Sequence, residues 1–152
     1  MKFSTRTRYG LKAVLLLASR YGEGSLSVSQ IARKEDLSLA YLEQILNTLK
    51  KKGLVKSVRG PQGGYMLTKR PAAVNLKELL DFLVGENALT RLSKGNGLHS
   101  PQDEAAIAHE LFWQKFKLSL EKNLSQISLK DLLDEARSRK KLKNRSTHNF
   151  QI

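Results

Sequence analysis

Cysteine is absent from this chain of 152 residues, which excludes disulfide bonds and metal sites built on thiolates. Long apolar stretches are absent too, because the longest run, residues 13–18, is far too short to cross a bilayer. No small-residue cleavage site follows that run, so the N-terminus does not have the pattern of a signal peptide. We therefore expect a cytoplasmic protein with no membrane partner.

Signs of catalysis are also missing. No nucleophile–base pair stands out, no phosphate-binding loop occurs and no carboxylate pair has a recognisable setting, so we expect that the protein is not an enzyme. Among the three histidines, His99 and His109 lie near Asp103, Glu104 and Glu110, which leaves a metalloenzyme open as a remote alternative. Scattered polar residues of this kind are more often plain surface groups, and we expect no metal.

Acidic residues are scarce at both ends of the chain. Residues 1–70 carry 14 Lys/Arg and 4 Asp/Glu, residues 71–136 carry 7 and 10, and residues 137–152 carry 6 and none. The formal net charge of +13 is therefore concentrated in the first half and in the tail. A strongly basic first half indicates a polyanionic partner, either nucleic acid or an anionic membrane surface.

Helical periodicity accounts for the first fifty residues. The expected helices cover, in order, residues 4–22, 27–36 and 39–52. Ser27–Gln30 fits a capping box, Ser38 is a good N-cap, and Gly53 suits the position just after a helix. The third helix should bury one apolar stripe, made of Leu42, Ile45, Leu46 and Leu49.

After Gly53 the pattern becomes extended. Residues 54–58 and 65–68 are short β-type runs on either side of a segment, 59–64, with three glycines and one proline, which predicts a hairpin with a flexible tip. Helix, short helix, tight turn, helix and hairpin together make a winged helix-turn-helix within a mainly α fold. The later expected elements are a helix over 75–84, a loop over 85–103, a long helix over 102–124 and a short helix over 128–139.

These elements suggest three regions. Residues 1–84 would form the winged helix-turn-helix DNA-binding domain, and residues 85–136 the effector loop and dimerisation helix. Residues 137–152 are basic and polar, and we expect a disordered tail.

The second helix of such a motif lies in the major groove, with its N-terminal residues at the base edges. Glu43 can accept a hydrogen bond from cytosine, Gln44 can pair with adenine, and Ala40 is a further candidate base contact. Arg59 on the hairpin tip can enter a minor groove. The other candidate DNA contacts are Lys2, Arg6, Arg8, Ser38, Lys50, Lys56 and Gly60. The plainer alternative for each is a solvated surface side chain.

Four stretches are more specific than these patterns. They are Arg8-Tyr9-Gly10, Ser38–Gln44, Gly53-Leu54-Val55 and, above all, Val58–Tyr65 with the sequence VRGPQGGY. Through them residues 1–70 resemble the Rrf-two (Rrf2) family of bacterial winged-helix transcription regulators, which includes IscR-, CymR- and NsrR-like members.

The resemblance implies base contacts from Glu43, Gln44 and Arg59 and backbone contacts from Tyr9 and Tyr41. IscR-like members have a serine where this chain has Ala40, so one hydrogen bond to the operator is lost. Iron–sulfur members hold a cluster through three cysteines before the long helix. The matching loop, residues 92–109, has none, so we expect no cofactor.

The long helix is apolar on more than one side, which predicts a second subunit as its partner. Its candidate dimerisation residues are Ala108, Phe112, Phe116, Leu120 and Leu124. We therefore expect a homodimeric repressor or dual regulator that binds double-stranded DNA at a palindromic operator. An unknown small molecule or protein could be its effector. Two alternatives stay open: an adaptor that works through a protein partner, and a general basic nucleic-acid-binding protein.

Overall fold

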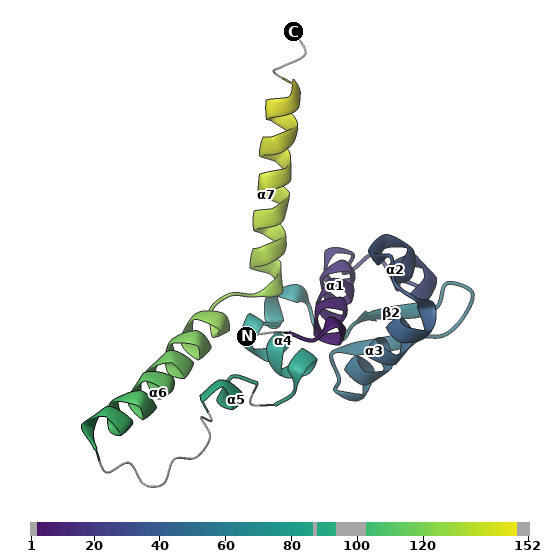
Figure 1. Cartoon of the computed structure of the whole chain (residues 1–152). Coiled ribbons are helices and arrows are strands. Elements are labelled where there is room, and N and C mark those ends of the chain that lie inside the picture. Colours follow the sequence, from purple (N-terminus) through teal and green to yellow (C-terminus); the bar gives the residue numbers. More distant parts are fainter. Residues whose placement is uncertain (1–2, 87, 94–102, 149–152) are drawn as a thin grey trace. The chain divides into compact units, whose positions relative to one another are not determined.

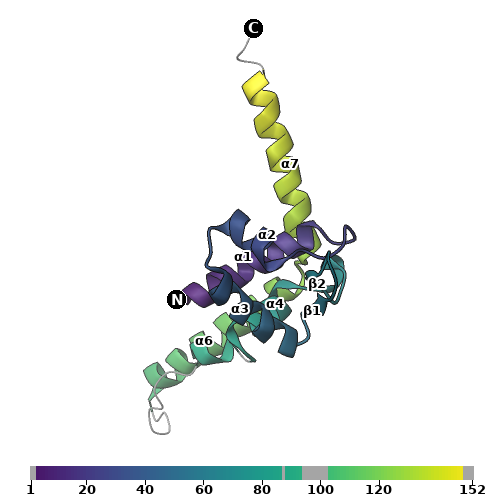
Figure 2. The same cartoon turned by 90° about the vertical axis from the view of Figure 1, so that its right-hand side faces the viewer.

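The computed structural model describes residues 3–86, 88–93 and 103–148 (Figures 1 and 2). The fold is mainly helical with a small two-stranded sheet, as predicted. The chain forms two compact units: Met1–Val74 with Ser128–Ile152, and Asn75–Ile127. Within the described residues, no helix has both the length and the apolar character that crossing a membrane requires.

Three helices begin the first unit: α1 (Thr5–Ser19), α2 (Val28–Glu35) and α3 (Leu39–Lys51). The predicted capping box is confirmed, because the Ser27 and Gln30 side chains each bind the other residue's backbone N–H. The predicted stripe of α3 is confirmed as core and meets buried residues of α1 and α2. These core residues are Val14, Leu17, Ile31, Leu42, Ile45, Leu46 and Leu49.

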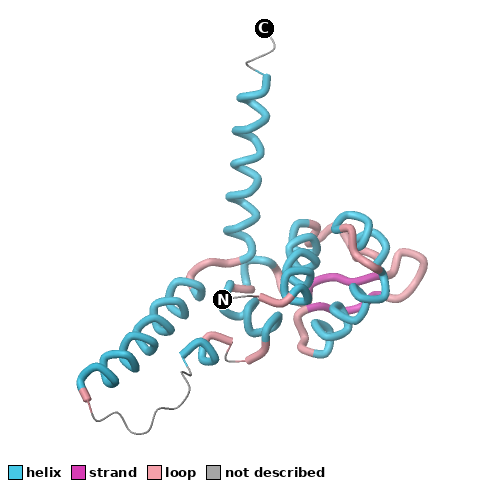
Figure 3. The backbone as a smooth tube through the Cα atoms, viewed as in Figure 1, coloured by secondary structure: helices cyan, strands magenta, loops and turns pink. Residues whose placement is uncertain are grey.

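The hairpin consists of β1 (Val55–Val58) and β2 (Gly64–Leu67), paired antiparallel (Figure 3). A third backbone segment joins it. The Leu26 N–H donates to the Tyr65 carbonyl at 2.9 Å, and the Tyr65 N–H donates back to the Leu26 carbonyl at 2.8 Å. The hairpin is therefore tied to the segment just before α2 by a pairing that the local sequence did not reveal.

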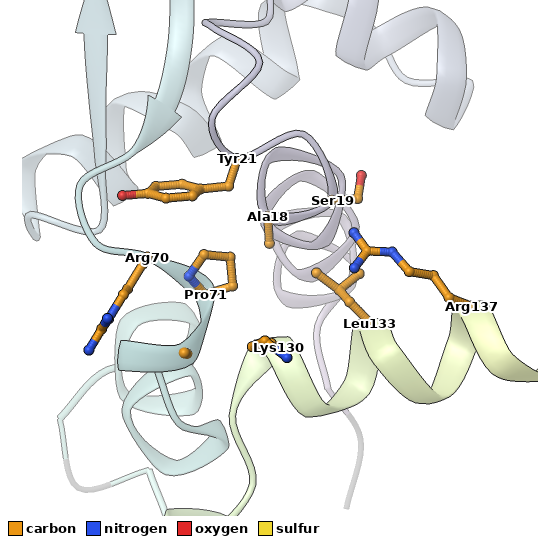
Figure 4. Close-up of a pocket in the computed structure, with 9 residues that line it drawn as sticks. Ala18, Ser19, Tyr21, Arg70, Pro71, Lys130, Leu133 and Arg137 are labelled. Atoms are coloured by element: carbon orange, nitrogen blue, oxygen red, sulfur yellow. The ribbon is translucent and has the colours of Figure 1, made fainter.

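Helix α7 (Leu129–His148) completes the first unit, together with the short 3₁₀ helix η1 (Pro71–Ala73). Leu129 is fully buried, and its N–H donates to the Val74 carbonyl at 2.9 Å. A hollow of about 340 Å³ lies where α7 meets α1 and η1 (Figure 4). It is lined by Ala18, Ser19, Tyr21, Arg70, Pro71, Ala72, Lys130, Leu133 and Arg137.

The second unit contains α4 (Leu76–Val84), α5 (Thr90–Ser93) and α6 (Glu104–Ser125). Helices α4 and α5 both contact α6. The Leu76 N–H donates to the Ile127 carbonyl at 2.9 Å, which closes the unit where the chain enters and leaves it. Buried side chains come from α4 and from the segment before α5, namely Leu79, Ala88 and Leu89.

The structure corrects the prediction of a disordered tail for residues 137–148, because α7 continues to His148, while residues 149–152 lie outside the described residues. The segment has no glycine or proline and is rich in lysine and arginine, which favour helices. Ion pairs one helical turn apart, Lys130–Asp134 and Glu135–Arg139, support its beginning. Sequence periodicity did not reveal this continuation, because few apolar residues follow Leu133.

Two other expectations also change. The predicted loop 85–103 contains α5, although residues 94–102 lie outside the described residues. The expected boundaries at 84 and 136 do not match the compact units, because α4 packs against α6 and α7 packs against α1 and η1. Both differences come from long-range packing, which local sequence patterns do not contain.

Candidate nucleic-acid interface

The beginning of α3 presents a polar face to solvent. Ala40, Glu43 and Gln44 are exposed, while the neighbouring Leu42 and Ile45 are buried at 0% and 3%. Among the described residues, the side chains of Glu43 and Gln44 have no hydrogen-bond or ion-pair partner. Both predicted base-reading side chains are therefore available to a ligand.

The N-terminus of α3 is capped by Ser38, whose hydroxyl oxygen accepts a hydrogen bond from the Tyr41 N–H at 3.2 Å. The Ser38 hydroxyl can still donate its proton, and the side chain is exposed. The positive end of the helix dipole also favours an anion at this point. Ser38 therefore suits a contact to a DNA phosphate.

Two candidate residues of α1 turn out to bind α3. The rings of Tyr9 and Tyr41 meet edge to face with centroids 5.9 Å apart. Arg6 donates from Nη2 to Oγ1 of Thr48 at 2.5 Å, and Thr48 in turn donates to the Gln44 carbonyl at 3.0 Å. These contacts join the two helices and orient α3, a role that the sequence did not suggest. Arg6 and Arg8 are nonetheless exposed to solvent.

The hairpin tip holds Arg59 in an exposed position. Gly60 follows it with a φ of +113°, a left-handed conformation that favours glycine. The Gly63 N–H donates to the Gly60 carbonyl at 2.9 Å, and the Ser25 hydroxyl donates to the Gln62 carbonyl at 2.7 Å. The tip is thus held from two sides, by its own turn and by the segment that precedes α2.

Gly64 is required by the close approach of Leu26. A Cβ atom at position 64 would lie 2.1 Å from the Leu26 carbonyl oxygen and 2.7 Å from the Ser27 nitrogen. Gly63 is similarly restricted, because a Cβ there would lie 2.5 Å from the Val58 carbonyl oxygen. The paired glycines of the VRGPQGGY stretch are therefore explained by backbone packing alone.

Tyr65 connects the hairpin to α3. Its ring is buried, and its hydroxyl donates to Oδ1 of Asn47 at 3.2 Å. Burial, and to a smaller extent the negative charge of Glu43, raise the pKa of Tyr65 above its ordinary value. The phenol therefore keeps its proton and remains a donor to Asn47. Asn47, Tyr65 and Ser25 position the candidate site, and sequence reasoning did not single them out for this role.

The remaining basic candidates lie along the same unit. Lys50 is exposed in the last turn of α3, and Lys56 is exposed on β1. Lys2 lies outside the described residues. The candidate base contacts thus occupy two places, the start of α3 and the hairpin tip, and the basic candidates lie on α1, α3 and β1.

Helix α6 exposes the predicted dimerisation face only in part. Phe112 and Phe116 are 58% and 40% exposed and stack with centroids 6.2 Å apart, and Ala108 is exposed too. Leu120 and Leu124 are half-buried. Solvent also reaches three further apolar residues of α6, namely Ile107, Leu111 and Leu118.

Trp113 was not among the predicted residues. Its ring lies 5.2 Å from that of Phe112 and 5.9 Å from that of Phe116, measured between centroids. Its Nε1 donates to Nε2 of His109 at 3.1 Å. The three aromatic rings form a continuous cluster on α6, which is an anchor of the kind that protein interfaces favour.

An iron–sulfur cluster of the thiolate type does not fit this chain, because the sequence offers no cysteine. No group of three or more histidine or acidic residues that could hold a metal ion occurs in the described part of the chain. His109 already accepts a hydrogen bond from Trp113, and His99 lies outside the described residues.

Comparison with known proteins gives consistent matches over most of the chain. The Rrf2 family profile, described as "Iron-dependent Transcriptional regulator", matches residues 3–135. The HTH-type transcriptional regulator CymR of Bacillus subtilis is 36% identical over 132 residues, which are 87% of this chain and 89% of that protein.

Two solved structures are similar in fold as well as sequence. CymR of B. subtilis, described as its global cysteine regulator, has a TM-score of 0.70 at 34% identity and covers 89% of this chain and 98% of its own. IscR of T. potens has a TM-score of 0.69 at 36% identity, over 90% of this chain and 88% of its own.

Proposed function

Because the chain belongs to the Rrf2 family of DNA-binding transcriptional regulators, a family of regulators and not of enzymes, we propose that it binds a palindromic operator as a homodimer. In each subunit the start of α3 lies in the major groove, and Arg59 reaches the neighbouring minor groove. Glu43 and Gln44 read base edges, while Ala40 leaves room beside them. No cofactor takes part.

The observation that carries this proposal is the exposed polar face of α3 beside a hairpin that is fixed to the same helix. The Tyr65–Asn47 hydrogen bond and the backbone pairing of Leu26 with Tyr65 connect the two reading elements. The distance between the start of α3 and Arg59 is therefore fixed when α3 lies in the major groove of a duplex. This favours site-specific binding over the alternative of a general basic nucleic-acid-binding protein.

The exposed aromatic cluster on α6 supports the homodimer. Two such faces from two subunits would bury each other about a two-fold axis, and a two-fold protein matches a palindromic site. With 22 residues at about 1.5 Å each, α6 is about 33 Å long, close to one turn of B-DNA. Half-sites about one turn apart, or a multiple of it, are the expected arrangement.

Replacing Gln44 with alanine should change which sequences are bound, because the amide is the side chain best suited to read adenine. Selection of bound sites from random DNA, with wild type and Gln44→Ala in parallel, measures this. We expect one position of each half-site to lose its adenine preference. Identical selected sequences would show that Gln44 reads no base.

Replacing Arg59 with alanine should weaken operator binding by about 1–3 kcal/mol and relax an A/T preference at one position. Titration of the selected operator and of a mixed-sequence duplex measures both effects. Arg20→Ala is the matched control, because Arg20 is an exposed arginine of the same unit that pairs with Glu23. Equal losses on both duplexes would make Arg59 a phosphate contact that carries no sequence information.

A further inference from the structure

The second half of α7 differs from the rest of the chain in charge. Residues 137–145, which we call the basic arm, contain six lysines and arginines and no acidic residue. The match to the family profile ends at residue 135. The basic arm therefore lies outside the stretch that the profile matches, and we examine its role from this chain's own residues.

The basic arm is attached to the unit that carries α3 and the hairpin. The first turn of α7 is held by buried Leu129 and by a reciprocal cap, in which Ser128 and Asp131 bind each other's backbone N–H. Leu133 points toward Ala18 of α1, as Figure 4 shows. Beyond these contacts, Figures 1 and 2 both show α7 continuing away from α1, and the side chains of residues 137–145 are exposed.

Charge repulsion works against a helix in this segment. Arg137 pairs with Asp134, and Arg139 pairs with Glu135. Within the described residues, no carboxylate lies within ion-pair distance of Lys140, Lys141 or Arg145. Arg137, Lys141 and Arg145 follow each other at intervals of four residues, a spacing at which like charges destabilise a helix. A polyanion bound along this ridge would relieve the repulsion.

The composition of the basic arm distinguishes among three kinds of partner: a lipid surface, a second copy of the chain and a nucleic acid. Leu142 is its single leucine, and with no other large apolar residue the segment has no apolar face. Insertion into a lipid surface needs such a face, and a coiled coil with a second copy needs an apolar seam. Phosphates along a nucleic acid need only cations at short intervals, which the arm supplies.

We propose that the basic arm binds the phosphate backbone of duplex DNA next to the operator. This rests on the proposed function, because the arm belongs to the same unit as the helix that receives the duplex. The contact is independent of sequence. It raises the affinity for all duplexes, and it lengthens the DNA segment that each subunit covers.

The test uses the full chain with Lys140, Lys141 and Arg145 replaced by glutamine, which preserves helix propensity and removes three charges. The control replaces the same residues as Lys140→Arg, Lys141→Arg and Arg145→Lys, which keeps the charge. Dissociation constants are measured across a range of NaCl concentrations. The probes are a selected operator and a mixed-sequence duplex, each of about 40 base pairs.

We expect the glutamine variant to bind both duplexes about tenfold or more weakly near 0.1 M salt, while the ratio between them stays constant. The slope of log K against log salt concentration should fall by about 2 units, because each phosphate contact contributes about 0.9. Hydrogen exchange at the backbone amides of residues 138–145 should slow when either duplex is added to the wild type. The charge-conserving control should match the wild type in every measurement.

An unchanged salt slope in the glutamine variant would overturn the proposal. The proposal would also fail if the glutamine variant bound single-stranded RNA of equal length more weakly than the wild type but bound duplex DNA equally well. The Gln44→Ala selection separates this failure from that of the proposed function. If Gln44→Ala alters the selected sites while the arm variant behaves as wild type, only the arm proposal fails. If the arm variant loses all binding and Gln44→Ala changes nothing, site-specific recognition by α3 fails instead.

Discussion

Replacing Phe112 and Phe116 with glutamate is expected to give a folded monomer that binds its operator about a hundredfold or more weakly. The two rings are 58% and 40% exposed on α6, so their loss leaves the core of the second unit intact. Carboxylates in their place would have to be desolvated when two copies of α6 pack together. Without the dimer, each half-site is bound separately, and the gain from linking two binding events disappears.

Sedimentation velocity measures the oligomeric state, and titration of a full operator and of a single half-site measures binding. The full operator should lose affinity while the half-site does not. Gln114→Glu is the control, because it adds one negative charge at an exposed position on the same helix outside the aromatic cluster, with the loss of the hydrogen bond that Gln114 donates to Glu110. A variant that stays dimeric would place the subunit interface elsewhere.

Replacing Gly64 with alanine is expected to destabilise the first unit by about 1–3 kcal/mol, which lowers the Tm by roughly 2–12 °C for a chain of this size. The new Cβ would overlap the Leu26 carbonyl oxygen and the Ser27 nitrogen. Neither backbone atom can turn aside as a side chain would. The hairpin must therefore separate from Leu26, which breaks two backbone hydrogen bonds.

Thermal unfolding followed by circular dichroism measures this loss. Gly60→Ala is the control, because that glycine has a positive φ but no atom within 4 Å of an added Cβ. The free energy of unfolding of Gly60→Ala should fall by only about 1 kcal/mol, which is the strain of placing alanine at a positive φ. Equal losses in the two variants would show that strain alone accounts for both glycines. Gly64→Ala should also bind the operator more weakly, because Arg59 is then no longer held relative to α3.

Local chemistry made much of the first unit predictable. The Ser27–Gln30 capping box, the Ser38 cap and Gly53 after α3 each act over a few residues, so their sequence neighbours are sufficient to identify them. The apolar stripe of α3 follows from helical spacing alone. The exposure of Glu43 and Gln44 follows in turn, because residues between the buried positions must face outward.

Contacts between distant segments were not predictable in this way. Leu26 pairs with Tyr65, and Arg6 reaches Thr48, across about forty residues. Asp36 adopts a left-handed conformation with a φ of 53° at the end of α2, where a glycine would have been the clearer signal. Whether a residue supports the site or touches DNA depends on these contacts, which explains why Arg6 and Tyr9 carry a structural role in addition to the predicted one.

The two backbone hydrogen bonds at the unit boundaries have a consequence for engineering. The Leu129 N–H donates to the Val74 carbonyl in one unit, and the Leu76 N–H donates to the Ile127 carbonyl in the other. The segment that leaves the first unit and the segment that returns to it therefore run next to each other. Residues 75–127 are in effect an inserted cassette with closely spaced ends. If a short turn joins Val74 to Ser128, the first unit should fold without the second one. If residues 75–127 are replaced by the matching segment of a relative, the chimera should form subunit contacts like those of the relative and keep the DNA specificity of this chain.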